Sequence, residues 1–296
     1  MTSVPATPAP HDASTDVVVF GDWHATAGWA TQAIAQVAAA TPARHWYQVG
    51  DFGLWSVRAG TAKRSYLDAV QASLAAQGAQ LYVVLGNHEN YDLIEQFQHD
   101  DDGWGMLPAW DRIHYAPRAH VWTHPGTELM FAALGGAGSV DLRRRKLGHT
   151  WWMAEEITDA DVAGLLGLLP PERIDVFLSH EAPAGVTVIP GERVNGIADE
   201  AVIAYCARQR ERLQRAFAAA RPHWAFHGHW HLFHTARLTT ETPAGTSFET
   251  EVVGLDRDGE TGNAAILSCR LDNLALPLNI ARDGNTRPGA AVTAPG

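Results

Sequence analysis

An apolar run ends in a glycine and three polar side chains in the stretch Leu81-Tyr82-Val83-Val84-Leu85-Gly86-Asn87-His88-Glu89. A short continuous apolar run bounded by a turn residue is typical of a buried strand. The polar side chains therefore lie on a loop that leaves the carboxyl end of a strand. The glycine permits the sharp backbone turn that such a loop needs.

Four further segments repeat this arrangement of apolar strand and polar loop. They are Val17–Phe20 before Gly21-Asp22-Trp23-His24, Tyr47–Val49 before Gly50-Asp51, Asp175–Leu178 before Ser179-His180, and Trp224–Phe226 before Gly228-His229-Trp230-His231. In open α/β sheets, the loops at the carboxyl ends of the strands converge, so residues that are distant in sequence gather there. We expect the polar side chains of all five segments to form one site.

The donor types in these segments are those of a metal site. Carboxylate, amide oxygen and imidazole suit Mn, Fe, Zn or Co, and no cysteine occurs in any of the five segments. Any one segment alone is more simply explained as a turn or as a hydrogen-bonded core histidine. Five of them are poorly explained by independent turns, so the sequence predicts a two-metal hydrolytic site.

The order Asp-x-His, Gly-Asp, Gly-Asn-His-Glu, His and Gly-His-x-His resembles the calcineurin-like metallophosphoesterase superfamily, over roughly Val17 to His231. What the resemblance implies is one metal held by Asp22, His24 and His231, a second held by Asn87, His180 and His229, and Asp51 bridging both. It also implies that His88 stands beside the metals as a catalytic residue.

The chemistry expected of such a site is hydrolysis of phosphate mono- or diesters. Two cations about 3.5–4 Å apart share a hydroxide by lowering the pKa of bound water from 15.7 toward about 7. This bridging hydroxide would attack phosphorus in line with the leaving oxygen. Asp51 and His88 are the expected catalytic residues. His88 fits a general acid whose tautomer is fixed by Glu89 or by a backbone carbonyl.

The second motif departs from that of protein Ser/Thr phosphatases, which carry Gly-Asp-x-Val-Asp-Arg-Gly. This chain has Gly50-Asp51-Phe52-Gly53-Leu54-Trp55-Ser56, so the Asp that orients the catalytic His and the Arg that binds phosphate are both missing. This weakens the case for a protein phosphatase.

A replacement cation is offered by Arg143, Arg144 and Arg145, which follow a glycine-rich turn at 135–138. Arginine suits bidentate phosphate contact, so we predict that one or more of the three bind the substrate. The alternative is an ordinary solvated basic run. The following Trp151-Trp152-Met153-Ala154-Glu155 resembles bacterial and phage metallophosphoesterases, and its two tryptophans either line the substrate pocket or belong to the core.

Helix-forming runs alternate with the strands, which predicts an α/β fold. These runs are Ala25–Ala39, Ala59–Gln77, Tyr91–Gln98, Thr158–Leu168 and Asp199–Ala220. After His231, the β-rich runs Leu232–Leu238, Ser247–Val253 and Ala264–Leu271 indicate a second sheet. The family resemblance implies a four-layer α-β-β-α sandwich of two mixed sheets flanked by helices.

One catalytic domain is expected over residues 15–282, because dividing the chain would divide the site. The ends, 1–14 and 283–296, are rich in Pro, Ala and Thr and are expected to lack fixed structure. The amino terminus has no cationic start, and no apolar run approaches the roughly 18 residues of a membrane span. We therefore expect a cytoplasmic protein without membrane contact. The oligomeric state stays open.

The charge of the chain bears on its partners. With 22 basic and 33 acidic residues, the net charge is −11, which disfavours long nucleic acid because a nuclease generally needs a basic stripe. A phosphorylated small molecule or a phosphoprotein is the expected substrate. Two alternatives are a nuclease of the same superfamily and a non-catalytic, metal-binding regulatory protein. The intact Asp51, Asn87 and His88 argue against the non-catalytic regulatory protein.

Overall fold

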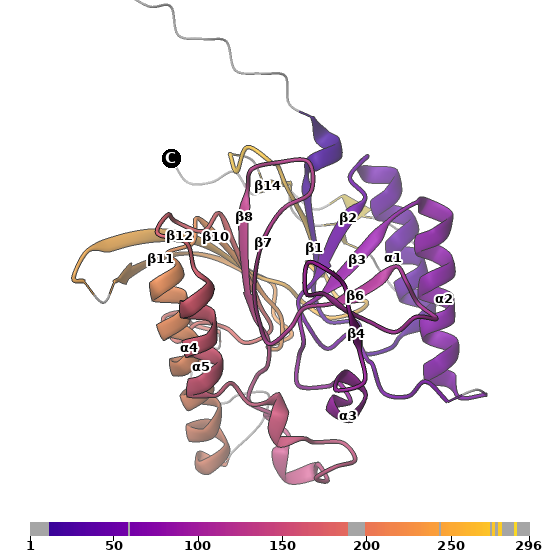
Figure 1. Ribbon diagram of the computed structural model, residues 1–296, viewed down its shortest axis with the longest axis horizontal. Helices are drawn as coiled ribbons and strands as arrows, with labels where there is room; N and C mark the ends of the chain where they lie inside the picture. The colour runs from indigo at the N-terminus through magenta and orange to yellow at the C-terminus, as the bar shows by residue number, and fades with distance from the viewer. Residues whose placement is uncertain are drawn as a thin grey trace, which may run out of the picture.

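Two β-sheets pack face to face, with helices on their outer faces (Figure 1). The computed structural model describes residues 12–58, 60–188, 199–242, 244–272, 274–275, 278–279 and 287–288. The predicted α/β class and the sandwich of two mixed sheets flanked by helices are confirmed.

The first sheet has the strand order β14-β13-β1-β2-β3-β6-β5-β4. Its four central strands run parallel: β1 (Val17–Phe20), β2 (His45–Gln48), β3 (Gln80–Val83) and β6 (Ile113–Tyr115). The flanking strands are antiparallel: β13 (Ala264–Leu267), β14 (Leu274–Ala275), β5 (Gly105–Met106) and β4 (Gln98–His99). The long helices α1 (Ala27–Ala40) and α2 (Ala62–Gln77) cover its outer face (Figure 1).

The second sheet has the order β11-β12-β10-β9-β8-β7. Its parallel centre comprises β8 (Met130–Leu134), β9 (Val176–Ser179), β10 (Trp224–His227) and β12 (Ser247–Gly254). The antiparallel edges are β7 (Ala119–Thr123) and β11 (His234–Glu241). Helices α4 (Asp159–Leu168) and α5 (Glu200–Ala220) lie outside it (Figure 1). A separate pair, β15 (Leu278–Asn279) and β16 (Arg287–Pro288), is antiparallel.

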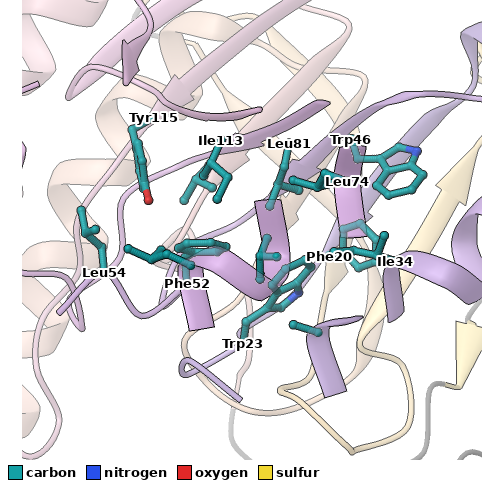
Figure 2. Close-up of a cluster of buried hydrophobic side chains, with 14 of the residues drawn as sticks. Phe20, Trp23, Ile34, Trp46, Phe52, Leu54, Leu74, Leu81, Ile113 and Tyr115 are labelled. Carbon is teal, nitrogen blue, oxygen red and sulfur yellow. The ribbon is translucent and has the colours of Figure 1, made fainter. Parts of the chain in front are cut away.

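Three apolar clusters separate the four layers. Alternate residues of β1 pack on opposite faces of the sheet. Phe20 (Figure 2) and Val18 pack toward α1 and α2, whereas Val17 and Val19 pack between the sheets. A third cluster joins the second sheet to α4 and α5. Strands buried on both faces read as continuous apolar runs, which is the pattern seen in the sequence. Full burial of each large apolar side chain contributes roughly 1.5–3 kcal/mol.

Most element boundaries differ slightly from those predicted. Helices α4 and α5 begin one residue late because Thr158 and Asp199 are their N-caps, each accepting a hydrogen bond from a backbone N–H of the first turn. Ala59 lies outside the described residues, and α2 begins after the N-cap Thr61. The helix predicted over Tyr91–Gln98 is wrong beyond its first turn: α3 spans Tyr91–Ile94, and Gln98 already belongs to β4.

The predicted tails fall largely outside the described residues. Residues 1–11 are not described, and Ala13–Thr15 form a short 3-10 helix capped by Asp12. Within 283–296, only Arg287–Pro288 is described, as β16. No helix in the described part of the chain combines the length and apolarity needed to span a membrane.

Candidate metal centre

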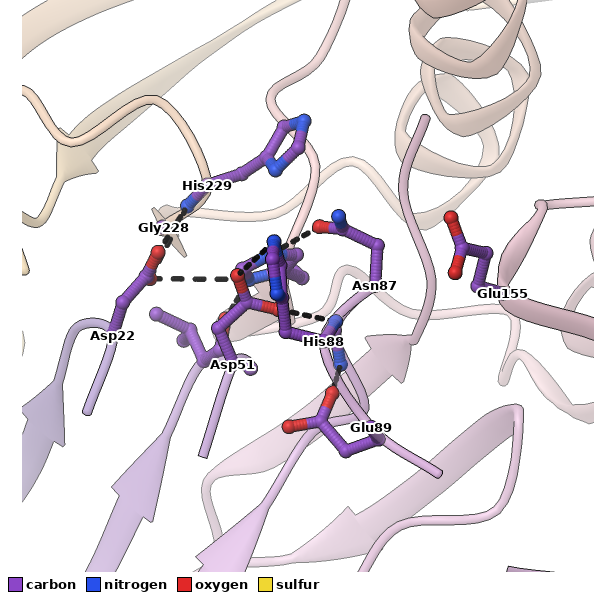
Figure 3. A network of polar contacts seen from close by, with 12 residues as sticks. Asp22, Asp51, Asn87, His88, Glu89, Glu155, Gly228 and His229 are labelled. Carbon is purple, nitrogen blue, oxygen red and sulfur yellow. Dashed lines mark hydrogen bonds and ion pairs between the residues drawn. The ribbon is translucent and has the colours of Figure 1, made fainter. Parts of the chain in front are cut away.

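The carboxyl ends of parallel strands from both sheets meet at one edge of the sandwich. Loops after β1, β2 and β3 deliver Asp22, Asp51 and Asn87, and loops after β9 and β10 deliver His180 and His229. Figure 3 shows the side chains of Asp22, Asn87 and His88 gathered around Asp51. The five polar segments of the sequence therefore lie together.

A first group of donors consists of Asp22, His24, Asp51 and His231, each of which can offer a ligand atom within 4.8 Å of the others. His231 Nε2 is 3.2 Å from Asp22 Oδ2, and His24 Nε2 is 3.5 Å from Asp51 Oδ2. Both carboxylates are buried and both imidazoles are partly exposed. The group has the size and donor chemistry of a divalent-cation site.

A second group lies on the other side of the same carboxylate. His180 Nε2 is 3.1 Å from Asp51 Oδ1 and 3.0 Å from Asn87 Oδ1. His180 Nδ1 is 2.7 Å from the carbonyl oxygen of Val49, so Nδ1 carries a proton and donates it there. The lone pair of Nε2 then faces two oxygen acceptors, an arrangement that requires a cation or a proton between them.

His229 lies against this second group. Its ring centroid is 5.0 Å from that of His180, and its backbone N–H donates to Asp22 Oδ1 at 3.2 Å. Its Nε2 is 3.0 Å from the carbonyl oxygen of Gly138. An Nε2–H that donates to this carbonyl leaves Nδ1 as the nitrogen with the lone pair. Six of the seven predicted ligand residues thus lie in two groups that share Asp51, and the seventh, His229, is brought beside the second group through the contact of its ring with that of His180.

The charges of the centre are strongly coupled. Burial opposes ionisation of Asp51, but His180 and His88 hold its pKa well below the usual range. Burial also opposes the charge on the His24 and His180 rings, yet nearby carboxylates raise the pKa of each to about 10. Protons on these imidazoles balance the buried carboxylates in the metal-free chain. Divalent cations would balance the same charge, so the donor set fits two metal ions.

The backbone is strained where it presents the candidate ligands. His24, Asp51, His229 and His231 have φ values of 46°, 52°, 69° and 48°. Non-glycine residues rarely adopt this left-handed region, and each instance costs on the order of 1–3 kcal/mol. Strain concentrated at one place in a fold indicates a functional site.

Close packing explains the glycines of three motifs. A Cβ atom at Gly50 would overlap the His180 ring, one at Gly86 would overlap Asp51, and one at Gly228 would overlap the Asp22 carboxylate. The glycines therefore let the backbone approach the buried donors, in addition to permitting turns.

His88 stands at the open side of the centre. Its backbone N–H donates to Asp51 Oδ1 at 2.8 Å, and its ring, 31% exposed, places Nε2 3.9 Å from Asp51 Oδ2. Nη2 of Arg145 contacts the same Nε2. Burial lowers the pKa of His88, Asp51 raises it and Arg145 lowers it, with a net decrease.

Glu89 was a candidate partner for the His88 ring, but its carboxylate instead binds backbone N–H groups. Its buried carboxylate accepts hydrogen bonds from the backbone N–H groups of Gly53 at 3.2 Å and Gly86 at 2.7 Å. It therefore joins the loops after β2 and β3. The partner that contacts His88 Nε2 is Arg145.

The three candidate arginines have different environments. The Arg145 side chain is only 4% exposed and donates to Asp141 Oδ1 at 2.7 Å and to the carbonyls of Asn87 and Thr150, both at 2.9 Å. Arg143 is exposed and pairs with Asp199, and Arg144 is exposed. Only Arg145 contacts a residue of the predicted centre.

Sequence reasoning missed three polar residues beside the centre. Asp258 Oδ1 is 3.2 Å from His24 Nδ1, and the Ser139 hydroxyl accepts a hydrogen bond from Asn87 Nδ2 at 3.1 Å. Glu181 accepts from Trp230 Nε1 at 2.9 Å. Asp258 lies between the β-rich runs Ser247–Val253 and Ala264–Leu271, outside the five polar segments, and nothing in the spacing of Ser139 or Glu181 indicates these contacts.

The sequence model of the calcineurin-like phosphoesterase family matches residues 15–233, which include every donor described above except Asp258. The chain belongs to this family. The calcineurin-like phosphoesterases are a dimetal-dependent family. In this chain, the cluster of Asp22, His24, Asp51 and His231 provides a possible metal site.

A solved structure of similar fold accords with this family. A dimetal phosphatase from Danio rerio superposes with a TM-score of 0.52 at 16% identity, covering 87% of this chain and 93% of that one. A 5'-nucleotidase from Candida albicans is less similar, with a TM-score of 0.36 at 15% identity, covering 87% of this chain and 49% of that one. At 16% identity, the likeness to the Danio rerio structure shows the fold alone. A search of curated proteins found no match.

A matched pair of glycine substitutions tests the close packing. In Gly228→Ala, the new methyl group overlaps the Asp22 carboxylate, whereas in Gly28→Ala it meets nothing within 4 Å. We expect Gly228→Ala to weaken Mn²⁺ binding at least 10-fold, because a displaced carboxylate loses its ligand geometry. Gly28→Ala should bind as wild type does. Equal Mn²⁺ affinities for the two variants in calorimetric titration would contradict the packing argument.

Proposed function

We propose that this protein hydrolyses phosphate esters with two metal ions. One ion would be held by Asp22, His24 and His231, the second by Asn87, His180 and His229, and Asp51 would bridge both. The observation that supports this most directly is the position of Asp51, whose Oδ1 lies beside His180 and whose Oδ2 lies beside His24. A carboxylate between two donor groups is suited to hold two cations together.

When bound, the two cations would activate water as the nucleophile and offset charge on the phosphoryl oxygens. The donor set of carboxylate, amide oxygen and imidazole favours Mn, Fe, Zn or Co. The chain itself supplies the fixed geometry. Asp51 is held by the His88 backbone N–H, and Glu89 joins the two loops that carry Asp51 and Asn87.

His88 is proposed to deliver a proton to the leaving oxygen. Its imidazole is 31% exposed and lies 3.9 Å from Asp51, where a substrate can reach it, and it is not one of the proposed metal ligands. Burial and the neighbouring Arg145 lower its pKa, which favours the neutral ring when no substrate is bound. A phosphate dianion bound beside the ring would raise this pKa, since a neighbouring negative charge favours the protonated imidazole.

Arg145 is proposed as the phosphate-binding cation. Its guanidinium is held by Asp141 and by two carbonyls while Nη2 reaches His88, so the charge is fixed beside the proposed proton donor. Such a preorganised donor stabilises developing charge on a phosphoryl group without reorganisation. Arg143 and Arg144 are not included in this proposal.

A small phosphorylated molecule is the proposed substrate. Three arginines of α5 are engaged within the fold: Arg210 donates to the carbonyl of Pro183, Arg212 to that of Ile157, and Arg215 pairs with Asp159. Together with the net charge of −11, this supports a small substrate over a long polyanion.

The first test is hydrolysis of para-nitrophenyl phosphate and bis-para-nitrophenyl phosphate by the chelated protein, before and after reloading with Mn²⁺. We expect turnover only after reloading, and preference for one substrate distinguishes a phosphatase from a phosphodiesterase. His88→Asn should keep its Mn²⁺ and lose about 10²–10⁴-fold in kcat, the usual contribution of general acid catalysis. If the reloaded wild type hydrolyses neither ester, the proposal is wrong for these ester classes and a binding role is favoured.

A second test separates the arginines. Arg145→Ala should reduce kcat/KM by about 10- to 1,000-fold, because it removes a fixed phosphate contact. Arg144→Ala removes the same charge from an exposed side chain and should act like wild type. Both variants should bind Mn²⁺ normally. Equal kinetic constants for the two variants would exclude Arg145 as the phosphate-binding residue.

A further inference from the structure

Two buried polar groups outside the proposed ligand set each contact one half of the centre. Resting on the proposed function, we propose that Asp258 and Ser139, the latter held by Glu155, are positioning residues, each of which fixes the ligands of a different metal ion. Asp258 would serve the ion of His24, and Ser139 would serve the ion of Asn87.

Asp258 reaches both ligands that follow β1. It lies in the turn after β12 and is 3% exposed. Its Oδ1 is 3.2 Å from His24 Nδ1, and its backbone N–H donates to the carbonyl of Asp22 at 2.8 Å. A carboxylate that accepts from Nδ1–H fixes the tautomer in which the Nε2 lone pair faces Asp22 and Asp51. Metal-binding histidines typically have such a partner.

Ser139 acts on the amide of Asn87. Its hydroxyl accepts from Asn87 Nδ2 at 3.1 Å, and this contact leaves Asn87 Oδ1 facing His180 Nε2 at 3.0 Å. An amide flipped by half a turn would present donor hydrogens to the metal instead of an oxygen. The hydrogen bond to Ser139 therefore selects the orientation that can bind a cation.

Glu155 holds this serine in place. The Ser139 hydroxyl donates to Glu155 Oε1, and both residues are completely buried. Figure 3 shows Glu155 on the side of Asn87 away from Asp51, so it does not belong to the donor groups themselves. Arg145 Nη1 lies 3.8 Å from Glu155 Oε2 and donates to the Asn87 carbonyl. Glu155, the acidic residue of the Trp-Trp-x-x-Glu stretch, therefore lies beside the centre.

The contacts described for the two arrangements lie on different loops. Asp258 contacts residues of the loop after β1, whereas Ser139 and Glu155 lie between β8 and α4 and contact the loop after β3. The two ions share Asp51, but the side-chain contact described for Asp258 orients only His24, and the one described for Ser139 orients only Asn87. Removal of either group should therefore weaken one metal ion and leave the other bound.

The experiment is calorimetric titration of Mn²⁺ into the chelated full-length chain. Wild type should bind two ions. Asp258→Ala and Ser139→Ala should each weaken one ion by about 10- to 100-fold, the usual loss on removal of a partner that orients a metal ligand. The double variant should weaken both ions. If Asp258→Ala does not fold, as judged by circular dichroism, Asp258→Asn replaces it with a smaller expected loss at the same ion.

Matched controls separate positioning from general disturbance. Glu260→Ala removes an exposed acid from the same turn as Asp258, and Thr250→Val removes a buried hydroxyl that donates to the Pro222 carbonyl near the amino-terminal end of β10. Both should bind two ions with wild-type affinity. Single variants that titrate like wild type, single variants that each lose both ions, or a double variant that keeps one tightly bound ion would overturn the assignment.

Failure of the proposed function is recognised separately. Wild type that binds fewer than two Mn²⁺ ions overturns the two-metal centre and the positioning assignment together. Wild type that binds two ions and hydrolyses a phosphate ester, while the variants titrate unchanged, overturns only the positioning assignment.

Discussion

The buried negative charge of Asp51 is the constraint around which this edge of the protein is arranged. Its carboxylate is 1% exposed and lies close to the equally buried Asp22. Such charges are costly away from water unless positive partners surround them. The histidines on loops of both sheets meet this requirement only because the parallel strands of both sheets end at the same place. The sandwich and the centre therefore depend on each other.

Holding these donors together costs conformational energy. Four candidate ligand residues have left-handed backbone conformations, and three glycines stand where no side chain fits. Strain of about 1–3 kcal/mol per residue persists only when the surrounding structure holds it in place. Three apolar cores, one between the sheets and one beneath each helical layer, supply that rigidity. The loops can then be strained while the strands that carry them remain fixed.

Much of the fold and the location of the centre could be predicted from the sequence. The apolar runs before Asp22, Asp51 and Asn87 are buried on both faces, so they stand out, and the helices begin at recognisable caps. The short edge strand β4 could not be recognised, because its two residues are exposed and follow a helical turn. The predicted ligand roles themselves stay predictions until metal binding is measured.

The contacts of Asp258 and Ser139 with the proposed ligands could not be predicted from the sequence, because they join residues that are far apart in the chain. Asp258 and Ser139 approach their partners across 234 and 52 residues of chain, and no local pattern encodes such an approach. Likewise, three consecutive arginines look alike in sequence. Only the turn at Leu142–Arg144 sends Arg145 toward His88 and leaves Arg143 beside Asp199.

The most direct measurement is the metal content and Mn²⁺ affinity of Asp51→Asn compared with wild type. A bridging carboxylate predicts two ions in wild type and weakened binding of both in the variant, because one substitution removes a ligand from each. The neutral amide keeps the shape of the side chain, so the fold should persist. Two ions bound to Asp51→Asn with wild-type affinity would contradict the account.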